Sequence, residues 1–222
     1  MNLEQKKITR LIFNSLIIIF TIAFWDIKLF FPIKVISILF HELSHGYAAI
    51  LSGGIVDSIS IQKSLNGVTS ISGGNDLFIA FSGYSGSLLF GMIIFYSSIK
   101  MKTKNFILIG IGVLLFISTV NLIEGFIGVF TGISYSIMFI ILGILEYGFI
   151  KYFVRFLGLV ILTYSMADII IDLLISNNQV NDAIILSVIT DVSPIVWGLV
   201  FFILSTASIL LMLKLDFKSD FL

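Results

Sequence analysis

Long apolar runs separated by short polar segments dominate the chain. A hydrocarbon core of about 30 Å requires about 20 helical residues. By this length criterion the runs predict spanning helices over residues 11–31, 32–51, 77–99, 156–175 and 194–213. The apolar stretch over residues 105–147 is too long for one helix and fits two, with a break near 121–132. The pattern therefore predicts an all-α polytopic membrane protein with about six to seven transmembrane helices.

The polar stretch over residues 55–76 has a different period. Its apolar residues partly alternate with polar ones on both sides of Asn66-Gly67, a dipeptide typical of tight turns. We therefore expect a short β-hairpin after the second span, at the membrane surface. A second polar stretch, residues 176–191, predicts a loop and a short helix that starts near Asn181-Asp182-Ala183.

Composition agrees with this interpretation. Of the 222 residues, 58% are hydrophobic and 12% are charged, and the mean hydropathy is +1.13. A soluble domain cannot bury that much apolar surface. The formal net charge is zero, so no basic surface indicates a nucleic-acid partner. The chain has no cysteine and no visible repeat or composition shift, and we expect a single domain over residues 1–222.

One motif inside the second apolar run contains residues that can bind a metal ion and act as a general base. His41-Glu42-Leu43-Ser44-His45 places two imidazoles four residues apart, on one face of a helix, where both can bind one tetrahedral Zn²⁺. Glu42 is placed to act as the general base on the attacking water. These are the only two histidines of the chain. A carboxylate this deep in an apolar run is costly, which indicates a functional role.

A catalytic zinc site has three protein ligands, and with no cysteine the third must be a carboxylate or an amide. At about 1.5 Å per helical residue, Asp168 lies at the depth of the two histidines whichever way its helix runs. Asp172, Asp182 and Glu124 remain alternatives. Asp172 lies one turn away, Asp182 falls at a helix start where a capping role is expected, and Glu124 is embedded in an apolar run.

The segment Gly83-Tyr84-Ser85-Gly86-Ser87 has some likeness to a nucleophile elbow. Its fifth position is serine and the chain has no further histidine to act as base, so a serine hydrolase is excluded. Gly83, Ser87 and Gly91 instead follow the small-xxx-small spacing of closely packed membrane helices. We expect this stripe to face a neighbouring helix.

Four segments together resemble the site-2 proteases, the zinc-dependent intramembrane proteases, and in particular their compact subgroup-B-like branch. They are residues 32–54 with the His-Glu motif, residues 80–91 with the glycine-serine segment, residues 156–172 with Asp168 and Asp172, and Asn181-Asp182-Ala183 followed by Pro194 and Trp197. The Asp-Gly motif that holds the third ligand in better-known members is absent. The late aspartates Asp168 and Asp172 match the subgroup pattern instead.

The resemblance implies an integral, multi-pass protein of a prokaryotic plasma membrane with one Zn²⁺ per chain. It implies His41, His45 and a late aspartate as ligands, Glu42 as base, and a transmembrane protein or peptide as substrate. The leading hypothesis is therefore a zinc-dependent intramembrane endopeptidase. The alternative is a non-proteolytic membrane protein that uses the same site for metal binding, regulation or assembly. The hairpin is then either a connector or an edge that receives an unwound substrate segment.

Overall fold

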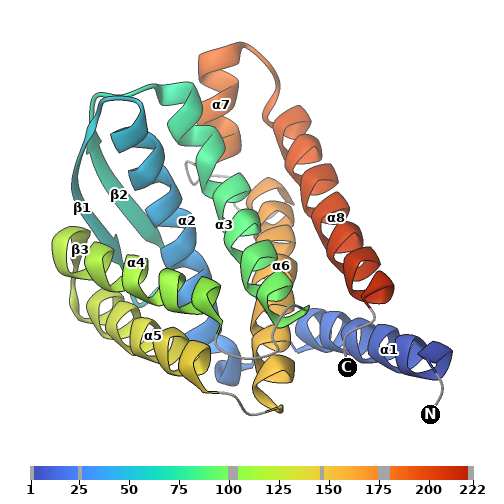
Figure 1. Cartoon of the computed structure of the whole chain (residues 1–222). Helices are drawn as coiled ribbons and strands as arrows, with labels where there is room; N and C mark the ends of the chain where they lie inside the picture. The colour runs from blue at the N-terminus through green and yellow to red at the C-terminus, as the bar shows by residue number, and fades with distance from the viewer. Residues whose placement is uncertain (1–2, 25–26, 100–104, 146–147, 175–180, 220–222) are drawn as a thin grey trace.

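The computed structural model describes residues 3–24, 27–99, 105–145, 148–174 and 181–219 (Figure 1). In chain order the elements are α1 (Leu3–Ala23), a 3₁₀ turn (Lys28–Phe30), α2 (Phe31–Leu51), β1 (Ile55–Ile61), β2 (Gly67–Ser72), α3 (Asp76–Ile99), α4 (Phe106–Leu122), β3 (Ile123–Glu124), α5 (Phe126–Ile144), α6 (Ile150–Leu174), α7 (Asp182–Thr190) and α8 (Pro194–Lys218). The predicted helical architecture is confirmed, and so is the hairpin after the second apolar helix. Residues 176–180 of the predicted polar loop lie outside the described residues.

The number of spans differs from the prediction. Within the described residues, α3, α5, α6 and α8 are long and apolar enough to cross a membrane. Helices α1 and α2 pass the same test only as a pair, which is bent by 112°, so that the described part of the chain has up to five spans. Helix α4 is apolar but has only 17 residues, and at about 1.5 Å per residue it falls short of a hydrocarbon core of about 30 Å. Six to seven spans are therefore not confirmed, because charges near the start of α1 and the polar motif in α2 interrupt the apolar runs.

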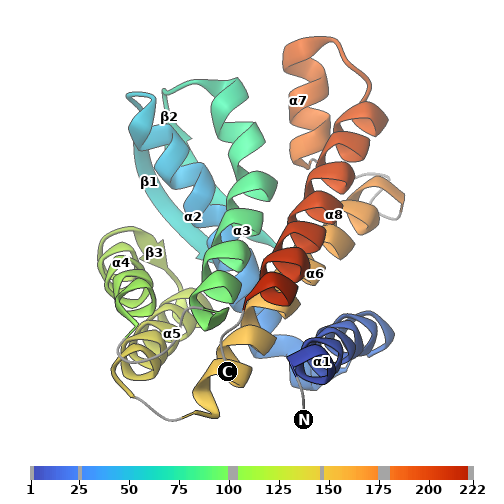
Figure 2. The same ribbon diagram turned by 45° about the vertical axis from the view of Figure 1, so that its right-hand side comes forward.

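Four helices form the frame that holds the central motif. Helix α3 packs between α2 and α6, and α6 also contacts α8. The α4–α5 pair lies across α2 and the sheet, and α1 crosses α6 (Figures 1 and 2). The largest hydrophobic cluster includes Leu39, Phe40, Ile59, Phe139 and Ile161, so it joins α2 to the sheet, α5 and α6. This core fixes α2 in place from several sides.

The hairpin is part of a small three-stranded sheet. Strands β1 and β2 pair antiparallel, and the two-residue strand β3 pairs parallel with the opposite edge of β1. The turn runs from Gln62 to Asn66, and Leu65 adopts a left-handed conformation within it. The predicted turn at Asn66-Gly67 is therefore displaced, because Gly67 already belongs to β2 and pairs with Ile61. The sequence pattern missed β3 because a strand of two residues leaves no period to detect. In the order β2-β1-β3, β2 keeps one edge that pairs with no described strand.

A buried ionic cluster joins α1, α6 and α8. The Asp216 carboxylate accepts a hydrogen bond from Arg155 Nη2 at 2.7 Å and another from Asn14 Nδ2 at 2.8 Å. Arg10 Nη1 lies 3.8 Å from the same carboxylate and donates to Ser219 Oγ at 2.9 Å. Arg10 and Asn14 of α1 therefore face the protein, while much of the outer surface of this helix is apolar.

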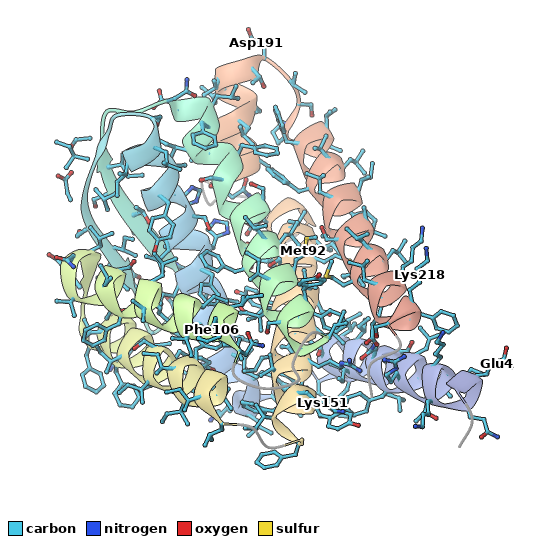
Figure 3. All side chains as sticks on the ribbon, viewed as in Figure 1. Glu4, Met92, Phe106, Lys151, Asp191 and Lys218 are labelled. Carbon is cyan, nitrogen blue, oxygen red and sulfur yellow. The ribbon has the colours of Figure 1, made fainter. Side chains whose placement is uncertain are left out.

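The two ends of the molecule are marked by charged residues. Asp191, which follows α7, lies at the end opposite Lys151 at the start of α6 (Figure 3). Arg155 lies one turn after Lys151, so the ionic cluster lies at the same end of α6 as Lys151. The metal-binding motif and α7 thus lie away from this cluster along the frame.

Candidate metal centre

Helix α2 brings the two histidines of the central motif together. The motif lies in the middle of a helix that buries Leu39, Phe40 and Leu43, and its four-residue spacing turns His41 and His45 to one side. The two imidazole rings have centroids 4.8 Å apart. The side-by-side placement of the histidines that the sequence predicted is therefore present in the structure.

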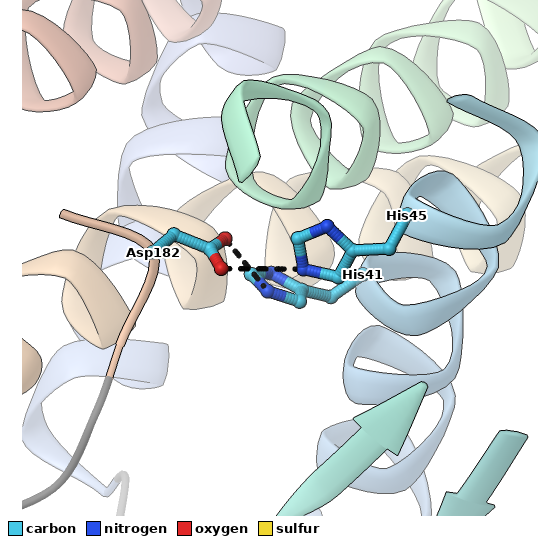
Figure 4. A group of neighbouring side chains, drawn as sticks. All are labelled: His41, His45 and Asp182. Carbon is cyan, nitrogen blue, oxygen red and sulfur yellow. Dashed lines mark ion pairs between the residues drawn. The ribbon is translucent and has the colours of Figure 1, made fainter. Parts of the chain in front are cut away.

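The third side chain of the group comes from α7. Asp182 Oδ2 lies 3.1 Å from His41 Nε2, and Asp182 Oδ1 lies 3.3 Å from His45 Nε2 (Figure 4). Ligand atoms of the three residues all lie within 4.8 Å of one another. Donor atoms held tetrahedrally at about 2.0–2.1 Å from a zinc ion are separated by about 3.3–3.4 Å. The two separations between Asp182 and the histidines are close to this value, and no pair in the group exceeds 4.8 Å, so the donor set fits one metal ion.

Asn181 explains why Asp182 can point at the histidines. The Asn181 side chain accepts a hydrogen bond from Ile184 N at 3.0 Å and so caps α7. Its Nδ2 also donates to the Asp172 backbone oxygen at 3.1 Å, which ties the start of α7 to the end of α6. The capping role that the sequence suggested for Asp182 is therefore wrong. The preceding residue caps the helix and leaves the Asp182 carboxylate available.

The space in front of the three side chains exists because α3 presents a glycine there. A Cβ atom on Gly83 would lie 2.4 Å from Asp182 Oδ2. It would lie 2.5 Å from both His41 Nε2 and His45 Cε1. Asp182 Oδ2 is buried and has no hydrogen-bond partner among the described residues. A buried carboxylate oxygen beside two imidazoles, in a space that a methyl group would fill, fits a bound metal ion.

A backbone contact sets the tautomer of His45. Its Nδ1 lies 2.8 Å from the Ile79 carbonyl oxygen, which can only accept a hydrogen bond. The Nδ1 atom must therefore carry a proton, so that Nε2 is the nitrogen that faces Asp182 and the one that can bind a metal. The aromatic ring of Tyr84, on α3, stands edge-on to the imidazole ring of His41, and the two ring centroids are 5.0 Å apart.

The charge state of Asp182 agrees with a ligand role. Burial alone would raise the pKa of this carboxyl, but the adjacent His45 and His41 hold it below its usual range. Asp182 is therefore ionised near neutral pH and offers a negative oxygen to a cation.

The other candidate ligands lie elsewhere. Asp168 and Asp172 of α6 line the same cavity but do not belong to the group of three, and Asp172 accepts a hydrogen bond from the Tyr84 hydroxyl. Glu124 is exposed in β3 and does not line the cavity. The geometry thus favours Asp182 over Asp168. Matching depth along a spanning helix favoured Asp168, whereas the structure brings Asp182 to the histidines because α7, which is not a candidate span, packs beside α3.

Glu42 lies on the side of α2 that faces the hairpin. Its carboxylate is buried, and Oε2 accepts a hydrogen bond from Thr69 Oγ1 at 2.7 Å. Gly67 approaches it closely as well, since a Cβ atom there would lie 2.2 Å from Glu42 Oε1. Sequence reasoning did not identify Thr69 or Gly67 as part of the site. The alternation in β2 places Thr69 and Gly67 on one face of the strand, but the neighbouring sequence does not indicate which residues that face contacts.

These residues share one large cavity. It has a volume of about 1190 Å³ and is lined by α2, β2, α3, α6 and α7. Polar residues on its wall include His41, Glu42 and Asp182, and apolar residues include Ile38, Ile184, Ile185, Val188 and Ile189. Convergent polar groups in a mostly apolar cavity are typical of a ligand-binding or active site.

The small-residue stripe of α3 serves two purposes. Gly91 faces α6, where a Cβ atom would lie 2.9 Å from Leu162 Cγ, as expected for close helix packing. Gly83 instead faces the metal-binding group. The spacing was correctly interpreted as a site of close approach, but at Gly83 the close neighbours are three polar side chains.

Comparison with known proteins gives one result. A family model described as peptidase M50B-like matches residues 14–212. No curated protein and no solved structure matches the chain. The matched region includes the histidine pair, Glu42, Gly83 and Asp182, and covers most of the chain. It confirms the resemblance to the site-2 proteases, and the chain belongs to the M50B-like peptidase family.

Proposed function

We propose that the chain is a zinc-dependent intramembrane endopeptidase that hydrolyses peptide bonds of membrane-embedded substrates. One observation carries the proposal. His41, His45 and Asp182 form a compact donor group in the same cavity as the Glu42 carboxylate. Family membership implies a metallopeptidase, and the apolar helices suggest a membrane protein. We place the protein in the plasma membrane of a prokaryote.

The donor set supports zinc as the metal, with His41, His45 and Asp182 as its ligands. Two neutral imidazoles and one carboxylate are a common set for catalytic zinc, whose fourth position stays open. A zinc ion bound there would supply an electrophile and activate water near neutral pH. Zn²⁺, one carboxylate ligand and hydroxide sum to zero charge, which a site of low dielectric constant tolerates best.

Glu42 supplies the proton transfers in the proposed reaction. Its carboxylate accepts a proton from the attacking water as the water oxygen bonds to the scissile carbonyl carbon. It then delivers that proton to the amine nitrogen as the C–N bond breaks. The products are a carboxylic acid and an amine, so the atoms of one water molecule are accounted for.

The cavity walls support an apolar substrate in an extended conformation. Ile184, Ile185 and Val188 of α7 form an apolar wall on one side, and β2 forms the other. A helical substrate must unwind, because its carbonyl oxygens are otherwise hydrogen-bonded within the helix. The free edge of β2 offers backbone groups that can pair with an unwound segment by strand addition.

The test combines cleavage and metal content. Purified protein is reconstituted in liposomes with a single-span peptide, and bound zinc is measured by elemental analysis. We expect Glu42→Gln to abolish cleavage and keep zinc, and Asp182→Ala to lose both. Asp168→Ala should keep zinc. Asp191→Asn, at the far end of α7, is the matched control and should resemble the wild type.

Three results would contradict the proposal. Full cleavage by Glu42→Gln would exclude its role as base. Retention of one tightly held zinc by Asp182→Ala, with its loss from Asp168→Ala, would restore the assignment based on helix depth. Zinc binding without cleavage of any single-span peptide would favour the non-proteolytic alternative.

A further inference from the structure

The inner face of β2 lies directly on the Glu42 side chain. Thr69 Oγ1 lies 2.7 Å from Glu42 Oε2 and 3.1 Å from the Glu42 backbone oxygen. The threonine hydroxyl has a single proton, and the shorter contact assigns it to the carboxylate. Hydrogen bonds to an ionised acceptor are stronger than neutral ones, so this contact fixes one oxygen of Glu42.

Gly67 restrains the same carboxylate from a second direction. A Cβ atom at Gly67 would lie 2.2 Å from Glu42 Oε1 and 2.6 Å from both Cδ and Cγ. The backbone of β2 therefore lies against the Glu42 side chain where only glycine leaves room. Both oxygens of the Glu42 carboxylate are therefore restrained by β2, Oε2 by the Thr69 hydroxyl and Oε1 by the Gly67 backbone.

The position of Thr69 is itself set by the packing of β1 on α2. Thr69 pairs with Ile59 of β1, and Ile59 is fully buried. A Cβ atom on Gly46 would lie 3.4 Å from Ile59 Cδ1 and 3.4 Å from Val56 Cγ2, so β1 lies in close contact with α2 just beyond His45. The same helix thus carries Glu42 and anchors the strand that contacts it.

We propose that Thr69 is a positioning residue that holds the Glu42 carboxylate in its reactive orientation. The inference rests on the proposed peptidase function and extends it to the hairpin. The hairpin then has a part in the reaction besides connecting α2 to α3. Because Thr69 acts through Glu42, its loss should lower kcat and leave KM and the bound metal largely unchanged.

The first experiment is kinetic and uses four substitutions in the reconstituted full chain. Thr69→Val keeps the shape and removes the hydroxyl, and we expect kcat to fall about 10-fold or more. Thr69→Ser restores the hydroxyl and should return kcat to within about 3-fold of the wild type. Thr206→Val, the same substitution on α8 outside the cavity, is the matched control. Thr69→Ala removes the hydroxyl in a smaller side chain and should reproduce the loss.

The second experiment does not depend on cleavage. In protein labelled with ¹³C at the glutamate carboxyl, the infrared band lost in Glu42→Gln identifies the Glu42 carboxylate. We expect Thr69→Val to shift this band and Thr69→Ser to leave it close to its wild-type position, whereas Thr206→Val should not move it. If the wild type cleaves nothing, the proposed function fails while this measurement still tests the contact.

Three results would overturn the inference. The first is an unshifted Glu42 band in Thr69→Val. The second is wild-type kcat in Thr69→Val when the wild type cleaves normally. The third is loss of bound zinc together with activity in Thr69→Val, because the defect would then lie in the metal ligands.

Discussion

The substitution Gly83→Ala tests the metal centre most directly, because one added methyl group meets three ligands at once. Its carbon would lie 2.4 Å from Asp182 Oδ2, and 2.5 Å from His41 Nε2 and from His45 Cε1. Non-bonded heavy atoms are comfortable at about 3.5 Å, so the ligands or α3 must move by about 1 Å. Metal–ligand distances tolerate about 0.2 Å. The methyl group and a metal ion are therefore incompatible in the observed arrangement.

The expected loss of zinc affinity is at least about 100-fold. Changes to residues that merely orient a ligand cost about 10–100-fold, and here the ligand atoms themselves are displaced. Stability should change little, since overpacking costs about 1–3 kcal/mol and alanine gains about 1 kcal/mol over glycine within a helix. A large loss of zinc affinity with little change in stability therefore distinguishes a damaged metal site from an unfolded protein.

The assay is competition for zinc between purified protein and a chelator of known affinity, with thermal unfolding measured in parallel. Gly110→Ala is the matched control, because a Cβ atom on this α4 glycine meets nothing within 4 Å. Unchanged zinc affinity in Gly83→Ala would refute the assignment of His41, His45 and Asp182 as ligands. A similar loss in Gly110→Ala would show that the effect is not specific to the site.

Two further predictions concern the frame. Asp216→Asn leaves the buried Arg155 guanidinium without its counter-charge, which should cost about 3–5 kcal/mol and lower the midpoint of thermal unfolding by about 10 °C. Asp191→Asn on the surface should leave the midpoint unchanged. A shift below about 2 °C in Asp216→Asn would contradict a structural role for the cluster. Gly158→Ala places a Cβ atom 2.5 Å from Phe95 N and should push α6 away from α3. We expect the free energy of unfolding to fall by about 1–3 kcal/mol relative to Gly110→Ala. Equal stability of the two variants would contradict this close helix contact.

The sequence by itself determined the features that depend on neighbours in the chain. Apolar runs predicted the helices because a helix in an apolar environment satisfies its own backbone. Pro32 marked the start of α2, and the alternation around Asn66-Gly67 predicted the hairpin. His41 and His45 share a face because four residues make about one helical turn. Glu42 follows from the same motif, and each of these inferences needs only local geometry.

The tertiary structure decided the rest of the candidate site. Asp182 lies 137 residues after His45 (182 minus 45), and it reaches the histidines only because α7 folds back beside α3. Depth along a helix favoured Asp168 because that argument assumes every ligand lies in a span. Gly83 and Thr69 likewise acquire their roles from packing between separate elements. Periodicity along one segment specifies which face is buried, but the residues that this face meets depend on how all segments pack together.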